Sequence, residues 1–492
     1  SLTQANKFTH PQCWLFSQVC PMACRYAQVF HLVISLVWRI GITGRWAHDK
    51  ATKRAFPLSA LVIKASRNYG ELTRNHKFGT LLKNAKMSSR GPIIAALFIV
   101  ACGSLLRLTY NSETFFIETV RDEAAIYFQY AIKLVEYGSF SGDGSEQAGS
   151  DAFLAPGYPA FLALNLKLAG SLGVEPYDLV MHSQVAVAAG TIWLLFLLGR
   201  LFMPAYWPLL PTTLLAFSPH HVSLGSYALT ETLFGFTLLA TIYFLAKGLM
   251  SRNRVEYLAC GIFLALSYLV NPVCLVIVPA IALCLWLFRR QANSAQGWPV
   301  SRLACCLLLL PVILTACLWS LRSSVVVPAE QSGSSDRLLA NLTVGLYPDY
   351  HEKWKSSVLN PEAEVTVPGA GVSENYATFF AEVSSRFSEA PVDMLTWFAF
   401  GKPYQLWQWD ILTGQGDIYV YEVLYSLYHI SAPALASYSI MHALHPWLLL
   451  CSVAGLLLII TRAKVSGDLT VPLVSYAVLL AISGVYLSLI HI

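Results

Sequence analysis

Two adjacent carboxylates stand at the head of a predicted helix in the stretch "RDEAAIYFQYAIKLVEYGSF", residues 121–140. After Asp122 and Glu123, apolar residues recur with the spacing of one helix face, so the pair falls in a first helical turn. There the free N–H groups and the helix dipole favour ionised carboxylates by about 0.3–1 kcal/mol. An ionised carboxylate can accept a proton from an incoming hydroxyl, as a general base does. The alternative is a helix cap with a solvated acid beside it.

The composition places this helix in a membrane protein. Of the 492 residues, 55% are hydrophobic and 12% are charged, and the mean hydropathy is +0.53, which excludes a soluble domain. The eleven cysteines lack the paired spacing of a metal site or a disulfide framework, and the basic residues cluster on loops rather than on a nucleic-acid-binding face. We therefore predict an all-α, polytopic transmembrane helical bundle whose partners include the lipid bilayer and no nucleic acid.

Nine apolar runs predict membrane spans, because about 20 apolar residues cross a hydrocarbon core. Basic residues precede the first run and follow the second, fourth, sixth and eighth, which places them all on one side, as the positive-inside rule requires. The helix that begins at Asp122 is therefore predicted on the external face, in a first external loop that covers residues 109–178. The predicted runs are 91–108, 179–198, 206–217, 229–245, 257–270, 273–287, 303–321, 447–460 and 473–490.

Residues 1–86 differ from the rest, since they are rich in Lys and Arg and lack sustained helical periodicity. They fit a basic cytoplasmic extension on anionic lipid, a transit peptide, or upstream sequence that is not natively translated, with Met87 as the start. The chain begins at Ser1 and ends inside an apolar run, so we expect a fragment at both ends. The remaining predicted parts are a transmembrane core (87–325), an external region with additional helices (326–445) and C-terminal spans (446–492).

Five short stretches follow one another between residues 90 and 325: "RDEAAIYFQYAIKLVEYGSF", "APGYPAFLAL", "LTETLFGFTLLATIYFLAKG", "LSYLVNPVCLVIVPA" and "LWSLRSSVVV". Their order resembles the membrane glycosyltransferases of the GT-C superfold, especially family 39 and the related aminoarabinose transferases. The chain departs from that family at "APGYP", where glycine replaces a proline, and at Ser323, where the family often has Asn. The order of the motifs carries the resemblance, because each motif alone is weakly specific.

The resemblance implies transfer of a hexosyl or pentosyl unit from a polyprenyl-phosphate-linked donor to an acceptor hydroxyl. The acceptor would be a glycan, a lipid or a protein, and the anomeric carbon would be inverted without a metal or another cofactor. It also implies an integral membrane protein, expected in the bacterial inner (plasma) membrane, that acts on the cell envelope side at the periplasmic face. Asp122 is the predicted base, and Glu123 is expected to orient the acceptor or support the site.

A cation is expected where the phosphate leaves, because it stabilises the negative charge that develops there. Arg322, at the end of the seventh run, is the first candidate for this role and Arg121 the second. The alternative for Arg322 is a snorkelling residue at the interface, and interface anchoring competes for the aromatic stretch around Trp409. Adjacent histidines do not easily face one ion, so we predict no metal site at "SPHH". Further candidates for a site wall or an acceptor contact are Glu231, Tyr158, His221, Trp409 and Asp410.

The competing function is a lipid or glycan transporter or flippase, which would also place carboxylates on a substrate path. The sequence shows no clear inverted repeat, and the acids fall at an external mouth rather than near the membrane midplane. A noncatalytic protein with the same fold is the other alternative. The glycosyltransferase hypothesis predicts that Asp122, Glu231 and Arg322 converge on one external cavity that opens to lipid.

Overall fold

The two short strands, β1 (Phe115–Phe116) and β2 (Val423–Tyr425), form one antiparallel pair, and helices dominate the rest of the described chain. The predicted all-α class is confirmed. Predictions for residues 1–86 and for the run 473–490 lie outside the described residues. A computed structural model describes residues 90–142, 149–251, 253–276, 278–279, 281–282, 302–327, 334–350, 352–353, 375–411 and 416–466.

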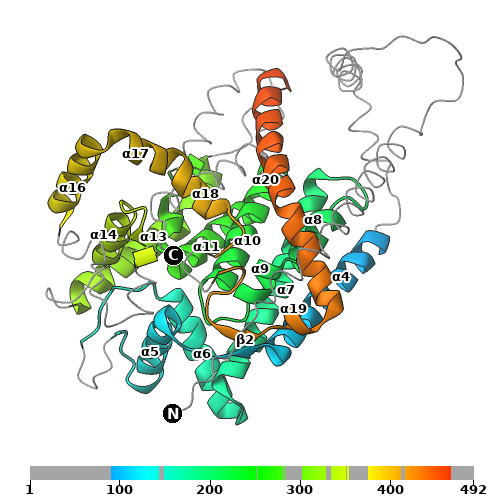
Figure 1. The fold of residues 1–492 in the computed structure, drawn as a ribbon, viewed down its shortest axis with the longest axis horizontal. Coiled ribbons are helices and arrows are strands. Elements are labelled where there is room, and N and C mark those ends of the chain that lie inside the picture. Colours follow the sequence, from blue (N-terminus) through cyan, green and yellow to red (C-terminus); the bar gives the residue numbers. More distant parts are fainter. Residues whose placement is uncertain are drawn as a thin grey trace, which may run out of the picture. The chain divides into compact units, whose positions relative to one another are not determined.

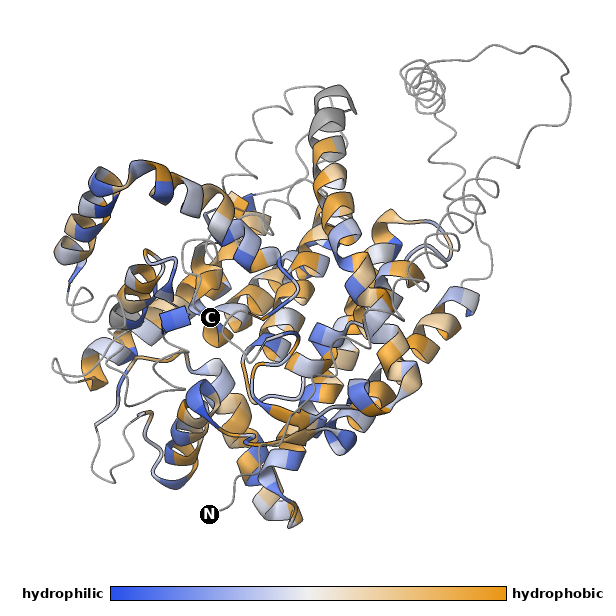
Figure 2. Cartoon of the chain, in the orientation of Figure 1, coloured by the Kyte–Doolittle hydropathy of each residue, from blue (hydrophilic) through white to orange (hydrophobic). Residues whose placement is uncertain are grey.

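Four helices in the described residues are long and apolar enough to cross a membrane, and they coincide with the first, second, fourth and seventh predicted runs, although the helix of the fourth run begins two residues after the start of that run. With 21 to 27 residues each, they are about 32–40 Å long, more than the roughly 30 Å of a hydrocarbon core. Apolar residues fill the middle of α4 in Figure 2, and many large apolar residues of α4 and α13 are exposed, as lipid-facing residues are. These helices are α4 (Arg90–Glu113), α7 (Pro176–Phe202), α10 (Glu231–Ser251) and α13 (Arg302–Val326).

The chain between α7 and α10, which contains the third predicted run (206–217), is interrupted rather than one long helix, and whether this run spans a membrane stays a prediction. The segment forms α8 (Leu209–Ala216), which has eight residues and is about 12 Å long, and then α9 (Pro219–Leu224). The break follows from Pro219, since a proline disfavours helical geometry in the residue before it. Ser218 accordingly has extended backbone angles, with φ −66° and ψ 119°.

This interrupted segment runs alongside α4 in the same direction (Figure 1). At Gly103 of α4 a Cβ atom would lie only 3.0 Å from the Cβ of Ala216, so glycine permits the close approach of the two segments. Beyond α9, the Ser226 hydroxyl donates a hydrogen bond of 2.5 Å to the Asn111 Oδ1 near the end of α4. The segment thus returns the chain to the end of α4, where α10 begins.

A buried arginine occupies the break between α8 and α9. Arg107 of α4 is 1% exposed, and its guanidinium donates to the carbonyl oxygens of Ala216 at 2.8 Å and Leu215 at 3.4 Å. It also donates to its own helix, at the Gly103 carbonyl. Because the last carbonyls of a helix have no intrahelical partner, Arg107 satisfies polar groups that would otherwise be costly to bury.

The helix α11 (Arg254–Val270) packs between α10 and α13 and contains the fifth predicted run. Its Gly261 faces α13 so closely that a Cβ atom there would lie 2.5 Å from the Leu308 carbonyl oxygen. A buried apolar cluster that includes Leu245, Leu264 and Leu308 holds the three helices together. The sixth predicted run begins in the 3-10 helix η1 (Pro272–Val276) and continues outside the described residues.

The other helices are shorter or less apolar, except α20, which contains the eighth predicted run. Figure 1 shows α16, α17 and α18 following one another in an arc, with the π-helix η3 (Trp397–Gly401) between the last two. The bounds of these helices are α5 (Asp122–Glu136), α6 (Gly157–Leu172), α14 (Ser334–Val344), α16 (Tyr376–Glu389), α17 (Pro391–Thr396), α18 (Lys402–Trp407), α19 (Leu427–Ile430) and α20 (Ala432–Ser466).

Candidate active site

Asp122 and Glu123 are the first two residues of α5, as the sequence predicts. Arg121 precedes them in extended conformation, and Asp122 itself has a left-handed φ of 49°. Asp and Asn visit that region more readily than most residues, because their short polar side chains bond locally. The Asp122 carboxylate lies 2.9 Å from Nε of Arg121, and its side chain is 51% exposed. This carboxylate is therefore held by its neighbour and remains open to a substrate.

Glu123 is paired with an arginine from a distant helix. Nη2 of Arg337, on α14, lies 2.9 Å from Oε1 of Glu123, whose side chain is 44% exposed. The Arg337 guanidinium also donates a hydrogen bond to the hydroxyl of Tyr127, one turn along α5. Burial raises the pKa of this hydroxyl, the charge of Glu123 raises it further, and Arg337 opposes both. Arg337 thus binds two successive turns of α5.

The pKa of the buried Tyr421 hydroxyl is affected by three carboxylates. It accepts a hydrogen bond of 3.3 Å from the Ala124 backbone N–H in the first turn of α5. Burial raises the pKa of Tyr421, and the charges of Asp122, Glu123 and Glu231 raise it further, against the effect of the Ala124 bond. The charges of all three carboxylates thus act on this one hydroxyl, whereas the convergence of Asp122, Glu231 and Arg322 on one external cavity stays a prediction.

Glu231 is the first residue of α10 and is only partly exposed. Its Oε2 atom is buried, and within the described part of the chain it has no hydrogen-bond partner. A buried carboxylate oxygen without a donor is unusual, since most buried polar atoms are hydrogen-bonded. This oxygen is suited to accept a hydrogen bond from a substrate hydroxyl.

Tyr158, near the start of α6, is fully buried beneath α5. Its hydroxyl donates a hydrogen bond of 3.0 Å to Gln184 of α7, and its ring packs edge-on against Tyr127 at 5.2 Å. Burial raises the pKa of this hydroxyl, and the charge of Glu231 raises it further. The structure thus places Tyr158 among the supports of the carboxylates and away from solvent.

Arg322 binds a different part of the loop that follows α5. Its Nη1 donates to the Asp151 carbonyl oxygen at 2.5 Å, and its guanidinium lies 4.9 Å from the ring of Trp319. The Asp151 carboxylate in turn accepts a hydrogen bond from Tyr130, which is two turns beyond Asp122 on α5. In the described residues, then, Arg322 contacts the loop beside the later turns of α5, whereas Arg337 contacts the carboxylates.

Trp409 lies in a group of histidines. Its ring is 4.4 Å from the ring of His220, and its carbonyl oxygen is 2.6 Å from Nε2 of the same residue. His221, next in α9, donates its backbone N–H to the Ser218 hydroxyl, and Asp410 directly follows Trp409. The described residues contain no group of three or more metal-ligating side chains. Trp409 and His220 thus contact one another rather than the carboxylates near Tyr421.

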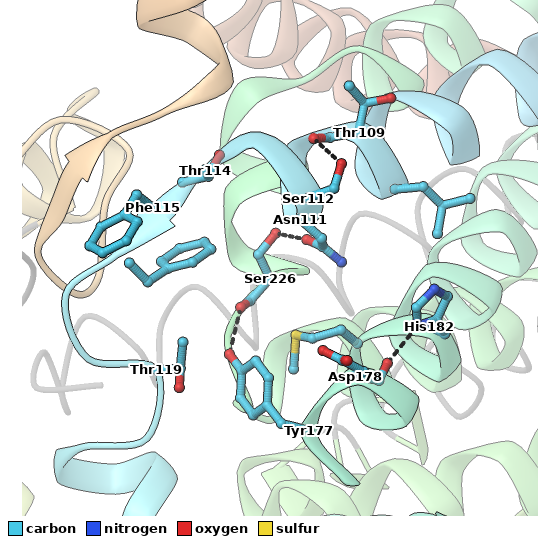
Figure 3. Close-up of a pocket in the computed structure, with 13 residues that line it drawn as sticks. Thr109, Asn111, Ser112, Thr114, Phe115, Thr119, Tyr177, Asp178, His182 and Ser226 are labelled. Atoms are coloured by element: carbon cyan, nitrogen blue, oxygen red, sulfur yellow. Dashed lines mark hydrogen bonds between the residues drawn. The ribbon is translucent and has the colours of Figure 1, made fainter. Parts of the chain in front are cut away.

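A pocket of ≈ 760 Å³ opens between the end of α4, β1 and the start of α7 (Figure 3). Neither the three carboxylates nor Arg322 line it, although Thr119 on its wall is only three residues before Asp122. The carboxylate cluster is nevertheless the stronger candidate for chemistry, because it combines ionised groups with an unpartnered acceptor oxygen.

Sequence reasoning missed Arg337 and Asp151, which both fix α5 in place. The stretch "SSDRLLANLTV" around Arg337 is an ordinary amphipathic helix, and it carries no motif that points to a partner far away in the sequence. Asp151 follows a Gly- and Ser-rich stretch that is typical of a solvated loop, yet its carboxylate is buried. A buried acid in such a stretch is visible only once the fold is known.

Comparisons with known proteins found no matching family model and no matching curated protein. Among solved structures, the chain is similar to the oligosaccharyltransferase of Archaeoglobus fulgidus tethered with an acceptor peptide that contains the NVT sequon. The identity is 14% and the TM-score 0.36, over 82% of this chain and 55% of that chain. It is also similar to the oligosaccharyltransferase AglB from the same archaeon in complex with an inhibitory peptide and a dolichol-phosphate. Here the identity is 12% and the TM-score 0.35, over 80% of this chain and 55% of that chain.

The chain thus spans about half the length of these two oligosaccharyltransferases, at 55% of each. Similarity at this level establishes neither a shared activity nor shared substrates. The resemblance to family 39 stays a prediction.

Proposed function

We propose that the chain is an integral membrane glycosyltransferase, which moves a sugar from a polyprenyl-phosphate-linked donor to an acceptor hydroxyl. The observation that carries the proposal is the pair of partly exposed carboxylates in the first turn of α5, Asp122 and Glu123, each 2.9 Å from an arginine nitrogen. Glu231, whose buried Oε2 has no partner in the described residues, completes the carboxylate cluster from the start of α10. This cluster lies where α10, one of the apolar helices, begins and where α5 leaves the loop after another, α4. Carboxylates at such a position meet both a lipid-borne donor and a water-borne acceptor.

Asp122 is the proposed general base. Its carboxylate is exposed, and the adjacent Arg121 orients it through a contact of 2.9 Å. In the reaction it takes the proton of the acceptor hydroxyl while the acceptor oxygen forms a bond to the anomeric carbon. The bond from that carbon to the phosphate oxygen breaks, the phosphate leaves with the electron pair, and the anomeric configuration is inverted.

The other two carboxylates would orient the acceptor. The Arg337 ion pair fixes Glu123 beside the base, and Glu231 offers an oxygen that has no donor in the described residues. Oriented hydrogen-bond acceptors lower the entropic barrier to attack, because the hydroxyl is already aligned when the donor binds. No metal or other cofactor enters this scheme.

Arg322 is the proposed cation for the donor phosphate. It lies near the end of α13, an apolar helix, and therefore at the depth where a lipid phosphate would sit. Arg121 is less suited to this role, since it pairs with the base, and in an inverting reaction the base and the leaving group occupy opposite faces of the sugar. We place this site on the periplasmic face of a bacterial inner membrane, following the predicted orientation of the basic loops.

One structural feature bears on the competing transporter hypothesis. Transporters often bind their ions at interrupted helices, where backbone carbonyls are free. The interruption between α8 and α9 has such carbonyls, but those of Leu215 and Ala216 accept hydrogen bonds from Arg107. This break is therefore filled by a guanidinium of the chain itself, which favours the enzyme over the transporter.

The proposed reaction is tested by the stereochemistry of its product. The purified full chain would be mixed with polyprenyl-phosphate hexoses and pentoses and a set of hydroxyl acceptors, and the anomeric configuration of donor and product compared by NMR. Inversion supports a single displacement with Asp122 as base. Retention of configuration contradicts that mechanism, and movement of intact donor across a vesicle membrane without transfer would support the transporter instead.

A further inference from the structure

The pocket in Figure 3 has the size of a small-molecule site and a lining suited to one class of ligand. Its volume of ≈ 760 Å³ falls within the roughly 300–1,000 Å³ of typical ligand pockets. The walls come from the last turn of α4, from β1 and the loop after it, and from the first two turns of α7. Hydroxyl and amide groups predominate among its polar side chains, which include Thr109, Asn111, Ser112, Thr119, Asp178 and Ser226.

The charge of this lining selects against anions. The lining residues include one carboxylate, Asp178, and neither lysine nor arginine. His182 is the one lining side chain that can carry a positive charge, and its Nδ1 lies 2.6 Å from the Asp178 carbonyl oxygen. When His182 is neutral, a phosphate or a carboxylate ligand meets the like charge of Asp178 without a cation to offset it. A neutral molecule with many hydroxyls meets no such penalty, because Asp178 can accept a hydrogen bond from it.

Several polar groups of the pocket are held in place by the protein. Asn111 accepts a hydrogen bond of 2.5 Å from Ser226 through Oδ1, which directs its amide N–H groups away from that bond. The Tyr177 hydroxyl donates to the Ser226 carbonyl oxygen at 3.1 Å, so its ring orientation is also fixed. Figure 3 shows Asn111 and Asp178 facing one another from α4 and α7. A donor and an acceptor are thus presented together, next to an aromatic ring.

This combination matches the chemistry of a sugar. Neighbouring hydroxyls of a sugar ring both donate and accept, which suits an amide opposite a carboxylate. The C–H faces of the ring are apolar and pack on aromatic side chains, here Tyr177 and Phe116.

The pocket is connected to the carboxylate cluster through packed aromatic rings. The ring of Phe116, on the pocket wall, lies 5.5 Å from that of Tyr227, which lies 5.2 Å from that of Tyr421. The Tyr421 hydroxyl accepts a hydrogen bond from the Ala124 backbone N–H, which follows Asp122 and Glu123 in the first turn of α5. Three packed rings therefore lead from the pocket wall to the first turn of α5.

We propose that this pocket binds an uncharged sugar unit of the acceptor, which would make the acceptor a glycan. The acceptor role rests on the proposed glycosyltransferase function, whereas sugar binding by the pocket does not. If one sugar of a glycan is bound here, a second sugar of the same glycan would place its free hydroxyl near the carboxylates, on the other side of the three packed rings.

The test measures binding separately from transfer. Saturation-transfer NMR and titration calorimetry on the full chain, in a detergent without a sugar headgroup, would use neutral methyl glycosides and disaccharides, with sugar phosphates for comparison. We expect binding of at least one neutral sugar, weakened about tenfold or more by Asp178→Ala and also weakened by Thr119→Val. The matched control is Asp393→Ala, because Asp393 is exposed and is the third residue of α17, which begins with a proline as α7 does.

The outcomes separate this proposal from the proposed function. Failure of every neutral sugar to bind, preference for sugar phosphates, or equal loss in the Asp393→Ala control would overturn the pocket assignment, with melting temperatures used to verify folding. Sugar binding without any transfer would leave the pocket in place and remove the glycosyltransferase function. Transfer whose acceptor KM is unchanged by Asp178→Ala and Thr119→Val would overturn the acceptor role.

Discussion

The Arg337 guanidinium lies 2.9 Å from the Glu123 carboxylate, although 214 positions separate the two residues in the sequence. This pair connects α14, which follows the last of the four long apolar helices, to the first turn of α5. Because Asp122 is the adjacent residue, the same contact fixes the backbone that carries the proposed base. Arg337 is thus a positioning residue for both carboxylates.

Loss of this contact should lower turnover more than donor binding. In Arg337→Gln, we expect turnover to fall about 10- to 100-fold with little change in the donor KM, since a small misplacement of catalytic groups is costly. Arg322→Gln should raise the donor KM as well as lower turnover, because it removes the cation proposed to meet the phosphate. Steady-state kinetics of both variants distinguish the two roles.

A suitable control is Arg386→Gln, which breaks an ion pair with Glu382 on α16, because Arg386 is 28% exposed and Arg337 is 24% exposed. The turnover of Arg386→Gln should remain near that of the wild-type protein. Equal effects of Arg337→Gln and Arg386→Gln would show that the Glu123 contact has no special importance for the reaction.

Arg107 should be important for stability. In Arg107→Gln, the carbonyls of Leu215 and Ala216 lose their charged donor, and we expect a loss of about 2–3 kcal/mol in the free energy of unfolding. Thermal unfolding of the detergent-solubilised protein would report this change as a lower melting temperature. Arg90→Gln, at the exposed start of the same helix, should leave the melting temperature nearly unchanged. A similar small effect of both substitutions would contradict the role of Arg107 at the break.

The buried Lys402 should make the stability of the protein depend on pH in the alkaline range. Burial lowers the pKa of its ammonium group from 10.5 to about 8. Between these values the unfolded chain binds a proton that the folded chain has released, so the free energy of unfolding rises as pH increases from about 8 to 10.5. Below pH 8 both states are protonated, and the burial penalty is fully present.

The substitution Lys402→Met should therefore raise the melting temperature at pH 7 and flatten its increase between pH 8 and 10.5. Melting curves recorded over this range, with the exposed Lys167→Met as control, provide the check. A Lys402→Met protein that keeps the full alkaline rise would show that another group titrates there.

The helical class and the position of the carboxylate pair could be predicted because they depend on local sequence. Composition and run length identify the long apolar helices, and the spacing after Asp122 marks the start of α5. The break between α8 and α9 was not predicted, because hydropathy averages over a window and ignores the helix-breaking effect of Pro219, which lies just beyond the predicted run 206–217.

The partners of the carboxylates could not be predicted in the same way. Arg337 and Tyr421 reach α5 from far along the chain, and neither stands in a motif of its own. Arg322 was an obvious sequence candidate because it ends an apolar run, yet in the described residues it contacts Asp151, Phe140 and Trp319. Long-range pairing of this kind depends on how helices pack, which a single sequence does not display.

The most direct measurement of the central claim is the turnover of an Asp122→Asn protein. Asparagine keeps the size of the side chain and tolerates the left-handed φ of 49° at this position, but it cannot accept the acceptor's proton. With insertion and donor binding verified, release of sugar from a labelled polyprenyl-phosphate donor to acceptor should fall by about 10²- to 10⁴-fold. Turnover close to that of the unchanged protein would contradict Asp122 as the base, and if Asp122→Asn combined with Glu123→Gln were also active, the carboxylate mechanism itself would be wrong.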